Sequence, residues 1–540
     1  MRWACLRFVL PVAALALGLA CSSGENGVAS NNHHGSGGTG AGGAAGAGGA
    51  TACEGGALAM CGGTCVDLTS DAANCGTCGN ACDSGASCCN SACVETSSCS
   101  FAVTSLDPPD GWQNGGDWVL LHGNGFADGM KVFIGAGRAP VLALDPHSAR
   151  IQTPPGPKGD TDLRIELGSS TATLKNGFHY SSGGLKQPWQ QKPMQKVRGE
   201  DPAVAVLQDG RVLIAGGTTV PDKYADALDT AEIFDRPTEK VTPATGSMSA
   251  PRWQDTAVTL LDGRVLVVGG ACLSNMSACN GDATTADLFD PKTDTFTPTA
   301  NKLNVARAYT RAVLLPDGRV FIASANDPSV EIYDPKTDSF TKIDHTQVHV
   351  FGFLVRLKDG RVLIGGGNGS ETHAELFDPD TDTFSDTGSL QQGRAMLTAH
   401  TLPDGRVIVI GGSSVSAGAI DTPLASMEAY DPKTGTFSTL SYALGTPRTW
   451  HASALVRDGT IIVAGGYTVK GQCDSLSDTV DQVDPVAGTV TPFATLPNKN
   501  TEWNAVTLLD GSIIGVGGGA CGTATALPDL DFLPGDPTPQ

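Results

Sequence analysis

The chain has 540 residues, 40% of them hydrophobic, and a formal net charge of −21 at pH 7. This length suits several domains, and the acidic balance argues against a nucleic-acid partner, because phosphates need a basic surface. Sixteen cysteines favour an oxidising compartment.

Residues 1–20 have the pattern of a secretory signal, in which Arg2 and Arg7 accompany an apolar run that ends at Ala20. Cys21 follows at once, and this arrangement resembles the signal of a bacterial lipoprotein, whose cysteine is lipidated. Gly18 departs from that pattern, so ordinary cleavage after Ala20 is the alternative. The resemblance implies an exported protein at the outer membrane or cell surface, held to the membrane through the lipid alone.

Two small segments precede the larger domains. The lipidation site and residues 22–52 form a Gly-, Ala- and Ser-rich stretch, 21–52, with too little apolar bulk for a core, which predicts a disordered tether. Residues 53–99 hold ten cysteines, an even number that predicts a disulfide scaffold. The Cys75-Gly-Thr-Cys78 spacing also suits zinc or redox chemistry. From 61 to 93 the cysteine pattern resembles the module named after plant stigma-specific proteins, which implies no activity and leaves the pairing open.

Residues 100–181 alternate short apolar runs with turns. Val119-Leu-Leu-His-Gly123-Asn-Gly125-Phe126, Val132-Phe-Ile-Gly135 and Phe178-His-Tyr180 resemble an IPT/TIG domain. The resemblance implies an immunoglobulin-like sandwich that serves as a spacer or a protein-interaction module.

Residues 182–533 repeat one pattern seven times, in which an apolar run, Asp-Gly and a second apolar run follow one another. The copies have their aspartates at Asp209, Asp262, Asp317, Asp359, Asp404, Asp458 and Asp510. Asp-Gly between two such runs predicts a β-hairpin with both turn residues at positive φ. The second run ends in Gly-Gly in every copy except the third, which has Ser324-Ala325.

A second hairpin follows in six copies. Four have an aromatic residue before Asp-Pro and a phenylalanine after it, as in Phe289-Asp290-Pro291 to Phe296, and weaker forms stand at Phe234-Asp235 and Val483-Asp484-Pro485. Two hairpins per repeat predict four-stranded blades and a propeller. The pattern resembles kelch repeats, which implies a seven-bladed kelch β-propeller and an all-β chain. The missing strand is predicted near Trp189, so that the N-terminal segment completes the last blade; Pro528 makes the strand at 525–532 doubtful. Residues 534–540 are left as a tail.

The loop that precedes each blade's first strand carries a basic residue in six of the seven copies: Arg198, Arg252, Arg307, His349, Arg394 and Arg448. Aromatic and histidine side chains stand beside them at Trp253, Tyr309, Phe351, Trp450, His451 and Trp503. We predict that these residues gather at one mouth and bind a ligand, because Arg pairs with carboxylates and aromatics dominate recognition surfaces. The alternative is that each Arg pairs with an acidic neighbour and joins adjacent blades.

An enzymatic alternative comes from the same resemblance. Some kelch propellers are copper radical oxidases, and Trp450-His451 lies where those have a Tyr-His pair, with Trp in place of the tyrosine. His345 and His349 lie in loop sequence, so the ligand spacing of a helix does not apply to them. We therefore predict no catalytic residue, no metal and no cofactor.

We predict an exported, surface-anchored binding or adhesion protein that presents its propeller mouth to a protein or carbohydrate ligand. The alternatives are an exported carbohydrate-active enzyme of the galactose-oxidase type and a purely structural envelope protein. The four propeller cysteines are predicted to form the disulfides Cys272–Cys279 and Cys473–Cys521, because all four lie in loops on one face.

Overall fold

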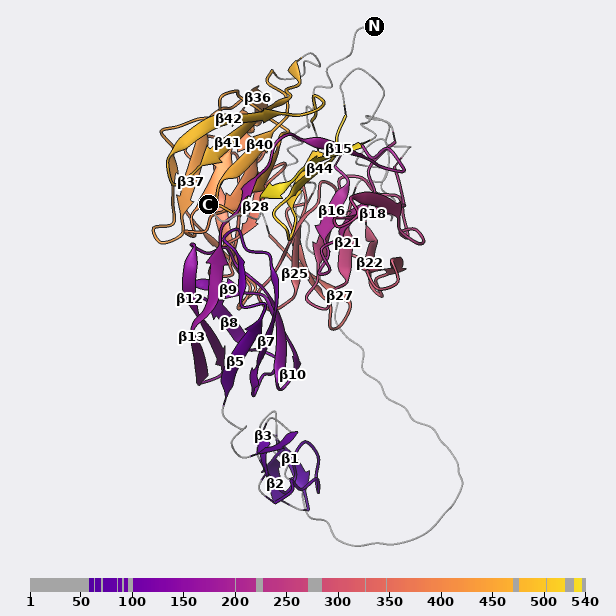
Figure 1. Cartoon of the computed structure of the whole chain (residues 1–540), viewed down its shortest axis with the longest axis vertical. Coiled ribbons are helices and arrows are strands. Elements are labelled where there is room, and N and C mark those ends of the chain that lie inside the picture. The colour runs from indigo at the N-terminus through magenta and orange to yellow at the C-terminus, as the bar shows by residue number, and fades with distance from the viewer. Residues whose placement is uncertain are drawn as a thin grey trace, which may run out of the picture. The chain divides into compact units, whose positions relative to one another are not determined.

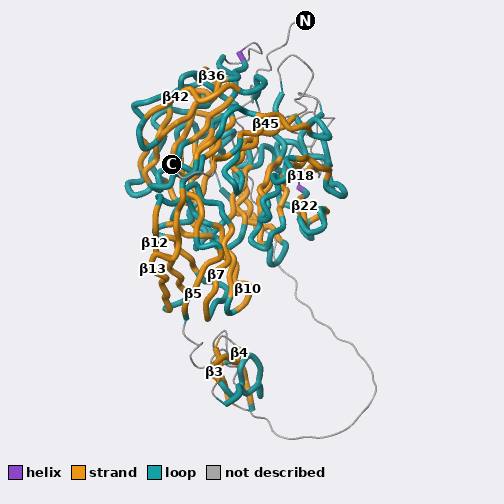
Figure 2. Tube along the Cα trace, viewed as in Figure 1, coloured by secondary structure: helices purple, strands orange, loops and turns teal. Residues whose placement is uncertain are grey.

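The computed structural model describes residues 58–536, apart from 63, 69–70, 85, 90–91, 96–100, 200, 220–226, 271–283, 326, 346, 470–474, 502 and 520–528. Its named elements are all β-strands (Figure 2). Within these residues, no helix is long and apolar enough to cross a membrane. Cys21 and the predicted disulfides Cys272–Cys279 and Cys473–Cys521 lie outside the described residues.

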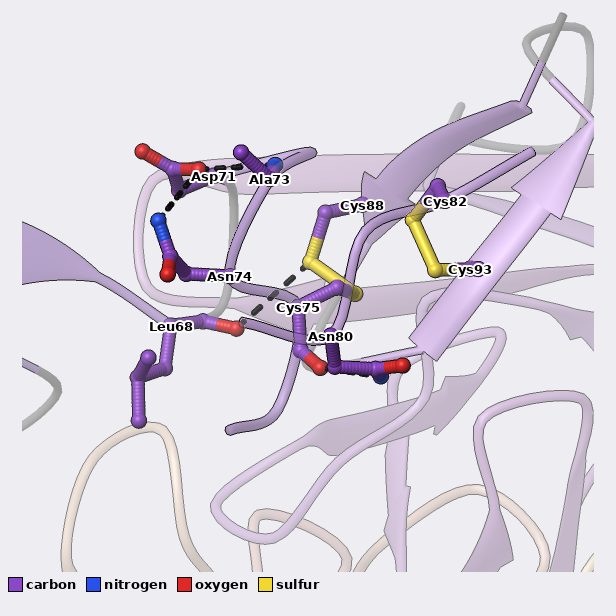
Figure 3. The surroundings of a disulfide bond; sticks show 9 residues. All are labelled: Leu68, Asp71, Ala73, Asn74, Cys75, Asn80, Cys82, Cys88 and Cys93. Carbon is purple, nitrogen blue, oxygen red and sulfur yellow. Dashed lines mark hydrogen bonds between the residues drawn. A yellow bond between two sulfur atoms is a disulfide. The ribbon is translucent and has the colours of Figure 1, made fainter. Parts of the chain in front are cut away.

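The cysteine-rich segment forms two hairpins, β1 (Leu58–Cys61) with β2 (Thr64–Asp67) and β3 (Ala86–Cys89) with β4 (Ala92–Glu95). Three disulfides join Cys61 to Cys78, Cys75 to Cys88 and Cys82 to Cys93, the last two seen in Figure 3, with Cα–Cα distances of 5.2–5.4 Å. Cys75 and Cys78 belong to different bridges. The zinc and redox alternatives for their spacing are therefore not supported.

The IPT/TIG segment is a sandwich of two sheets around a core that includes Val119, Leu121 and Phe178. One sheet contains β10 (Val141–Asp145), β11 (Ser148–Gln152), β7 (Trp118–Asn124) and β5 (Ala102–Asp107). The other contains β6 (Asp110–Trp112), β13 (Ser170–Ser181), β12 (Gly159–Leu167), β8 (Lys131–Ile134) and β9 (Gly137–Ala139). Strand β7 buries alternate residues, as expected when one face of a strand covers a core.

Seven four-stranded antiparallel sheets follow, here called sheets 1 to 7 in chain order (Figure 1). Sheets 1 to 3 contain β16 (Ala203–Val206), β17 (Val212–Ala215), β18 (Ala231–Asp235) and β19 (Lys240–Pro243); β20 (Thr256–Thr259), β21 (Val265–Val268), β22 (Ala286–Asp290) and β23 (Thr295–Pro298); and β24 (Arg311–Leu314), β25 (Val320–Ala323), β26 (Val330–Asp334) and β27 (Ser339–Ile343).

Sheets 4 to 6 contain β28 (Phe353–Arg356), β29 (Val362–Gly365), β30 (Ala374–Asp378) and β31 (Thr383–Asp386); β33 (Thr398–Thr401), β34 (Val407–Ile410), β37 (Met427–Asp431) and β38 (Thr436–Thr439); and β39 (Ala452–Leu455), β40 (Ile461–Ala464), β41 (Thr479–Asp484) and β42 (Thr489–Thr495). Sheet 7 contains β43 (Trp503–Thr507), β44 (Ile513–Gly517), β45 (Asp529–Leu533) and β15 (Gln190–Pro193). Shorter pairings join β32 (Arg394–Ala395), β35 (Ser413–Ser416) and β36 (Ala419–Pro423), and β14 (Gly184–Leu185) with β46 (Gly535–Asp536).

The first strand of each sheet, here called the inner strand, faces a common axis. The inner strands lie side by side in a closed circuit, in the order β16, β20, β24, β28, β33, β39 and β43, which returns to β16. The core lies between successive sheets, where residues such as Val265 and Phe289 of sheet 2 join a cluster with Leu213 of sheet 1. This arrangement is a propeller with a central channel.

The ring closes through strands that are far apart in the sequence. Strand β15, directly after Trp189, pairs antiparallel with β45 near the C-terminus. Strand β45 is described from Asp529 to Leu533, and Pro528 lies outside the described residues. The outermost strand of sheet 7 therefore comes from the N-terminal side, as expected from the position of Trp189.

The Asp-Gly hairpins differ from the predicted turn. In sheet 2 the Gly263 amide donates to the Leu260 carbonyl, and only the glycine has a positive φ, of 97°. This is a turn centred on Leu261 and Asp262 with a left-handed glycine after it, which matches the three-residue hairpin loop. The Asp262 carboxylate accepts from the Arg264 amide at 3.0 Å, which explains why an aspartate suits this place.

The Gly-Gly pairs lie where backbone from the next sheet approaches closely. Gly269 and Gly270 have φ values of 73° and 101°, and a Cβ on Gly269 would overlap Thr310. Both positions therefore require glycine. The third copy, with Ser324-Ala325, is followed by a short loop to β26.

The IPT/TIG segment contacts the face of the propeller that carries the Asp-Gly turns. Its Arg138 and Val141 amides donate to Lys358 and Pro316 carbonyls, and the Arg150 side chain donates to the Leu261 carbonyl. Arg138 also forms a two-pronged ion pair with Asp380, at 2.8 and 3.0 Å. These contacts reach sheets 2, 3 and 4. The opposite face, which carries the loops before the inner strands, is here called the open mouth.

Candidate functional site

The five arginines predicted to bind a ligand are in the interior. Arg198, Arg252, Arg307, Arg394 and Arg448 are 0–1% exposed. Each forms an ion pair, at 2.6–3.1 Å, with a carboxylate on the third strand of its own sheet: Glu232, Asp287, Glu331, Glu428 and Asp481. Four of them also donate to the carbonyl of the first glycine of the Gly-Gly pair, at 2.7–3.0 Å.

These side chains hold the first three strands of one sheet together. Burial lowers the pKa of Arg198, Arg307, Arg394 and Arg448, and the paired carboxylates act against that shift. The structure does not present these guanidinium groups to a ligand. It supports a structural role for the arginines, with one difference from the sequence-based alternative: the partner belongs to the same sheet and not to its neighbour.

Sheets 4 and 7 have other residues at the arginine position. In sheet 7 the Asn500 amide donates to the Gly517 carbonyl at 3.2 Å. In sheet 4 His349 is 9% exposed, with its Nδ1 2.8 Å from the Gly366 carbonyl and its Nε2 3.1 Å from Glu375. Both therefore reach the same glycine carbonyl as the arginines do.

The predicted aromatic residues divide into two groups. Trp253, His451 and Trp503 are buried, at 3–5% exposure. Tyr309, Phe351 and Trp450 are half-buried and meet at the open mouth, although they come from the loops before sheets 3, 4 and 6. The ring centres of Tyr309 and Phe351 are 4.6 Å apart, and those of Phe351 and Trp450 are 5.3 Å apart. This cluster is the part of the predicted mouth that the structure brings together.

The three aromatics belong to a ring of left-handed residues. Asp201, Gln254, Tyr309, Phe351, Met396 and Trp450 all have φ between 44° and 59°, and each comes two or three positions after the basic residue of its sheet. Left-handed backbone is unfavourable for bulky side chains. Hydrogen bonds between sheets compensate in part, because the Met396 amide donates to the Phe351 carbonyl and the Trp450 amide to the Met396 carbonyl. Five of these six residues, all except Met396, line the cavity at the open mouth.

A cavity of 260 Å³ lies at the open mouth, beside these aromatic rings. Its polar wall includes Asp201, Gln254, Arg311 and Asn504. Asp201 is half-buried and Arg311 is exposed to the cavity that both line. Burial raises the pKa of Asp201 to about 6, which Arg311 opposes. The sequence analysis missed both residues, because neither lies at a position that repeats as a polar residue.

The channel continues below this cavity. A second cavity, of 520 Å³, is lined by the inner strands and, at its end, by Gly115, Gly116 and Pro154 of the IPT/TIG segment. Arg457 lies 3.7 Å from the Trp112 ring centre, and Asn114 donates to the Leu455 carbonyl. Burial raises the pKa of Asp117 in this contact to about 6, against an opposing effect from Arg457. The IPT/TIG segment therefore lies across one end of the channel.

The copper-oxidase alternative requires metal ligands around His451. Its Nε2 lies 3.1 Å from the Thr398 hydroxyl, and burial lowers its pKa to about 3. Among the described residues, no group of three His, Cys, Asp or Glu side chains includes His451. With Trp450 in place of the tyrosine, the residues present do not fit a copper centre of that kind.

Comparisons with known proteins agree with the segment-by-segment interpretation. Residues 102–180 match the IPT/TIG domain, residues 49–102 the stigma-specific STIG1-like protein family, and residues 397–442 the kelch motif.

Transcription factor COE2 of Homo sapiens and of Mus musculus are 32% identical to this chain over 62 residues, which are 12% of the chain and 11% of each relative. Transcription factor COE1-A of Danio rerio is 36% identical over 53 residues, or 10% of the chain and 9% of that relative. The chain thus spans about a tenth of the curated relatives it matches.

Among solved structures, a fungal alcohol oxidase of the AA5 family, in complex with copper, aligns with a TM-score of 0.53. The two are 19% identical, and the alignment covers 65% of this chain and 76% of the oxidase. At this identity the likeness concerns the fold alone.

Proposed function

We propose that this chain is an exported, surface-anchored binding protein whose open mouth takes the end of a carbohydrate chain. The observation that carries the proposal is the cluster of half-buried rings of Tyr309, Phe351 and Trp450 at the wall of the 260 Å³ cavity. A sugar ring offers an apolar C–H face and a rim of hydroxyl groups. Aromatic rings suit the former, and Asp201, Gln254 and Asn504 suit the latter.

The size of the cavity supports a chain end over a long segment. Small-molecule sites begin at roughly 300 Å³, so 260 Å³ holds about one sugar unit. The IPT/TIG segment lies across the far end of the channel. This favours a ligand that inserts one end into the mouth over a polymer that passes through the whole channel. Export and lipidation at Cys21 would place this mouth at the cell surface.

A glycan array with the full chain, followed by titration calorimetry on the best ligand, tests the proposal. Trp450→Ala and Tyr309→Ala should each weaken binding about tenfold or more, the effect of losing a contact of ~1.4 kcal/mol or more at a recognition site. Val486→Ala, at a side chain that is 91% exposed elsewhere, is the control. Unchanged affinity in a folded Tyr309→Ala/Trp450→Ala protein would contradict the proposal. Peroxide release from sugars with stoichiometric copper would instead favour an oxidase.

A further inference from the structure

Sheet 4 differs from the other sheets around one carboxylate. The third strand of every sheet carries an acidic residue at the same register: Glu232, Asp287, Glu331, Glu375, Glu428, Asp481 and Asp531. The residue two positions before this acid carries a hydroxyl group in five sheets. It is an aspartate in sheet 7 and His373 in sheet 4. The five hydroxyl residues are Thr230, Thr285, Ser329, Ser426 and Thr479. These hydroxyls contact the Nη2 atom of the sheet's arginine. In sheet 4, His349 stands in place of the arginine and His373 stands in place of the hydroxyl residue.

A third histidine in sheet 4 replaces a buried apolar residue. Four positions before the arginine position, which Asn500 occupies in sheet 7, the other sheets have Met194, Met248, Leu303, Leu390, Leu444 and Leu496, all 3–9% exposed. Sheet 4 has His345 there, and its side chain is 12% exposed. Three departures from the repeat thus converge on Glu375.

A second carboxylate completes the group. Asp386 on β31 is the cross-strand partner of Glu375 on β30. The corresponding partners in the sheets with the same pairing are Pro243, Pro298, Lys342 and Thr439, so only sheet 4 of these has two acids directly opposite. Like charges in directly opposed positions are unfavourable unless a cation separates them.

The ligand atoms already lie close together. The Nε2 atom of His373 is buried without a hydrogen-bond partner, 3.7 Å from Glu375 Oε2 and 3.5 Å from Asp386 Oδ1. The Nε2 atom of His345 lies 2.9 Å from the same Glu375 oxygen. Ligand atoms around a tetrahedral zinc ion are roughly 3.3–3.5 Å apart, so the separations of His373 from the two carboxylates are close to the required ones.

We propose that sheet 4 binds a divalent transition-metal ion, Zn²⁺ by its ligand chemistry, through His373, Glu375 and Asp386, whose ligand atoms lie within 4.8 Å of one another. One imidazole nitrogen and two carboxylate oxygens form a donor set that Zn²⁺ accepts, with the fourth position left to water. His345 and His349 are positioning residues, because each holds one oxygen of Glu375, and His349 is itself fixed by the Gly366 carbonyl. The largely exposed Asp386 gives the ion access, while His345 and Glu375 also line the mouth cavity. The inference does not depend on the proposed carbohydrate ligand.

Titration of the chelator-treated full chain with Zn²⁺, by calorimetry and elemental analysis, tests this site. The matched variant is His345→Leu/His349→Arg/His373→Thr, which gives sheet 4 the residues that its sister sheets carry and is therefore expected to fold. It should bind one Zn²⁺ fewer than the natural chain, and Zn²⁺ should raise the melting temperature of the natural chain only. His179→Thr, at an exposed pair with Asp160 in the IPT/TIG segment, should change neither result.

The positioning residue His349 has its own readout. His349→Gln should keep the stoichiometry and weaken Zn²⁺ binding roughly 10- to 100-fold, the effect of losing an outer contact to a ligand. Equal stoichiometry in the natural chain and the triple variant overturns the proposal, as does the absence of Zn²⁺ uptake by the natural chain.

Discussion

At the scale of single residues, the arginines of this propeller illustrate how a charged side chain serves the interior. Arg448 is fully buried, and its Nη2 lies 3.0 Å from Asp481 while its Nη1 donates to the Gly465 and Thr479 carbonyls. Removing the arginine leaves a buried carboxylate without its cation, which is far more harmful than removing both groups.

Arg448→Met should therefore lower the free energy of unfolding by about 3–5 kcal/mol. The double variant Arg448→Met/Asp481→Leu should recover much of this loss, because no charge then remains buried. Urea unfolding measures both. A folded, equally stable Arg448→Met protein that no longer binds its ligand would restore the recognition role predicted from the sequence.

The sequence indicates which residues recur but not how deeply they lie. Arg448 and Trp450 are two positions apart in one loop, yet one is buried and the other lines the mouth. The direction of each side chain depends on the left-handed turn at Trp450, which no sequence pattern announces. The histidines around Glu375 were visible once the seven copies are aligned, since His345 and His373 each replace another residue type. That these histidines meet at Glu375 depends on the register of the strands. The spacing of His345 and His349 in the sequence does not predict that register.

At the scale of elements, the ring depends on one strand from the N-terminal side. Trp189, which precedes β15, is 7% exposed and packs in one cluster with Ile513 and Leu533 of sheet 7. The pairing of β15 with β45 covers the outer edge of that sheet, which would otherwise offer unpaired backbone groups to another chain.

Trp189→Ala should lower the free energy of unfolding by about 3–5 kcal/mol, as expected for the loss of a large core side chain. Cleavage between β15 and β16 by a protease should also become faster, because the closing strand is held less firmly. Val486→Ala should leave both properties unchanged. Equal proteolysis of Trp189→Ala and the natural chain would show that the closure does not depend on this anchor.

The repeats made this architecture predictable: apolar runs around Asp-Gly and Asp-Pro mark the hairpins, and the shortage of one hairpin indicates the closing strand. The turn type was not predictable in the same way. Asp-Gly fits a two-residue loop and a three-residue loop, and the choice depends on which pairing keeps Leu260 in register with Arg264.

At the scale of the whole molecule, buried carboxyl groups couple stability to pH. Burial raises the pKa of Asp255 and of Asp531 to about 7, from an ordinary value of 3.8. Between about pH 4 and pH 7 the folded chain keeps protons that the unfolded chain has released. Stability from these groups is therefore greatest below pH 4 and falls as the pH rises to 7.

The opposite behaviour belongs to paired carboxylates. Hydrogen bonds from Arg138 lower the pKa of Asp380 to about 2. Its contribution is present above pH 4 and is lost as the pH falls toward 2. For these groups together, stability is therefore greatest near pH 4.

Asp531→Asn should reduce the loss of stability between pH 5 and pH 8, because one titrating group is removed. The slope of the unfolding free energy should become smaller by up to ~1.4 kcal/mol per pH unit, and the melting temperature should fall less steeply. Differential scanning calorimetry across that range measures the slope. Asp421→Asn, at an exposed position of β36, is the control. An unchanged slope for Asp531→Asn would show that this carboxyl group does not titrate in the window.

The IPT/TIG segment lies across the Asp-Gly face and covers that end of the channel. Under the proposed function, a carbohydrate would enter past Tyr309 and Trp450, at the end of the channel away from the IPT/TIG segment. Its terminal unit would then make the contacts, and the rest of the polymer would stay outside. Ligands that differ only in their internal linkages should therefore bind with similar affinity, whereas a change in the terminal sugar unit should change the affinity.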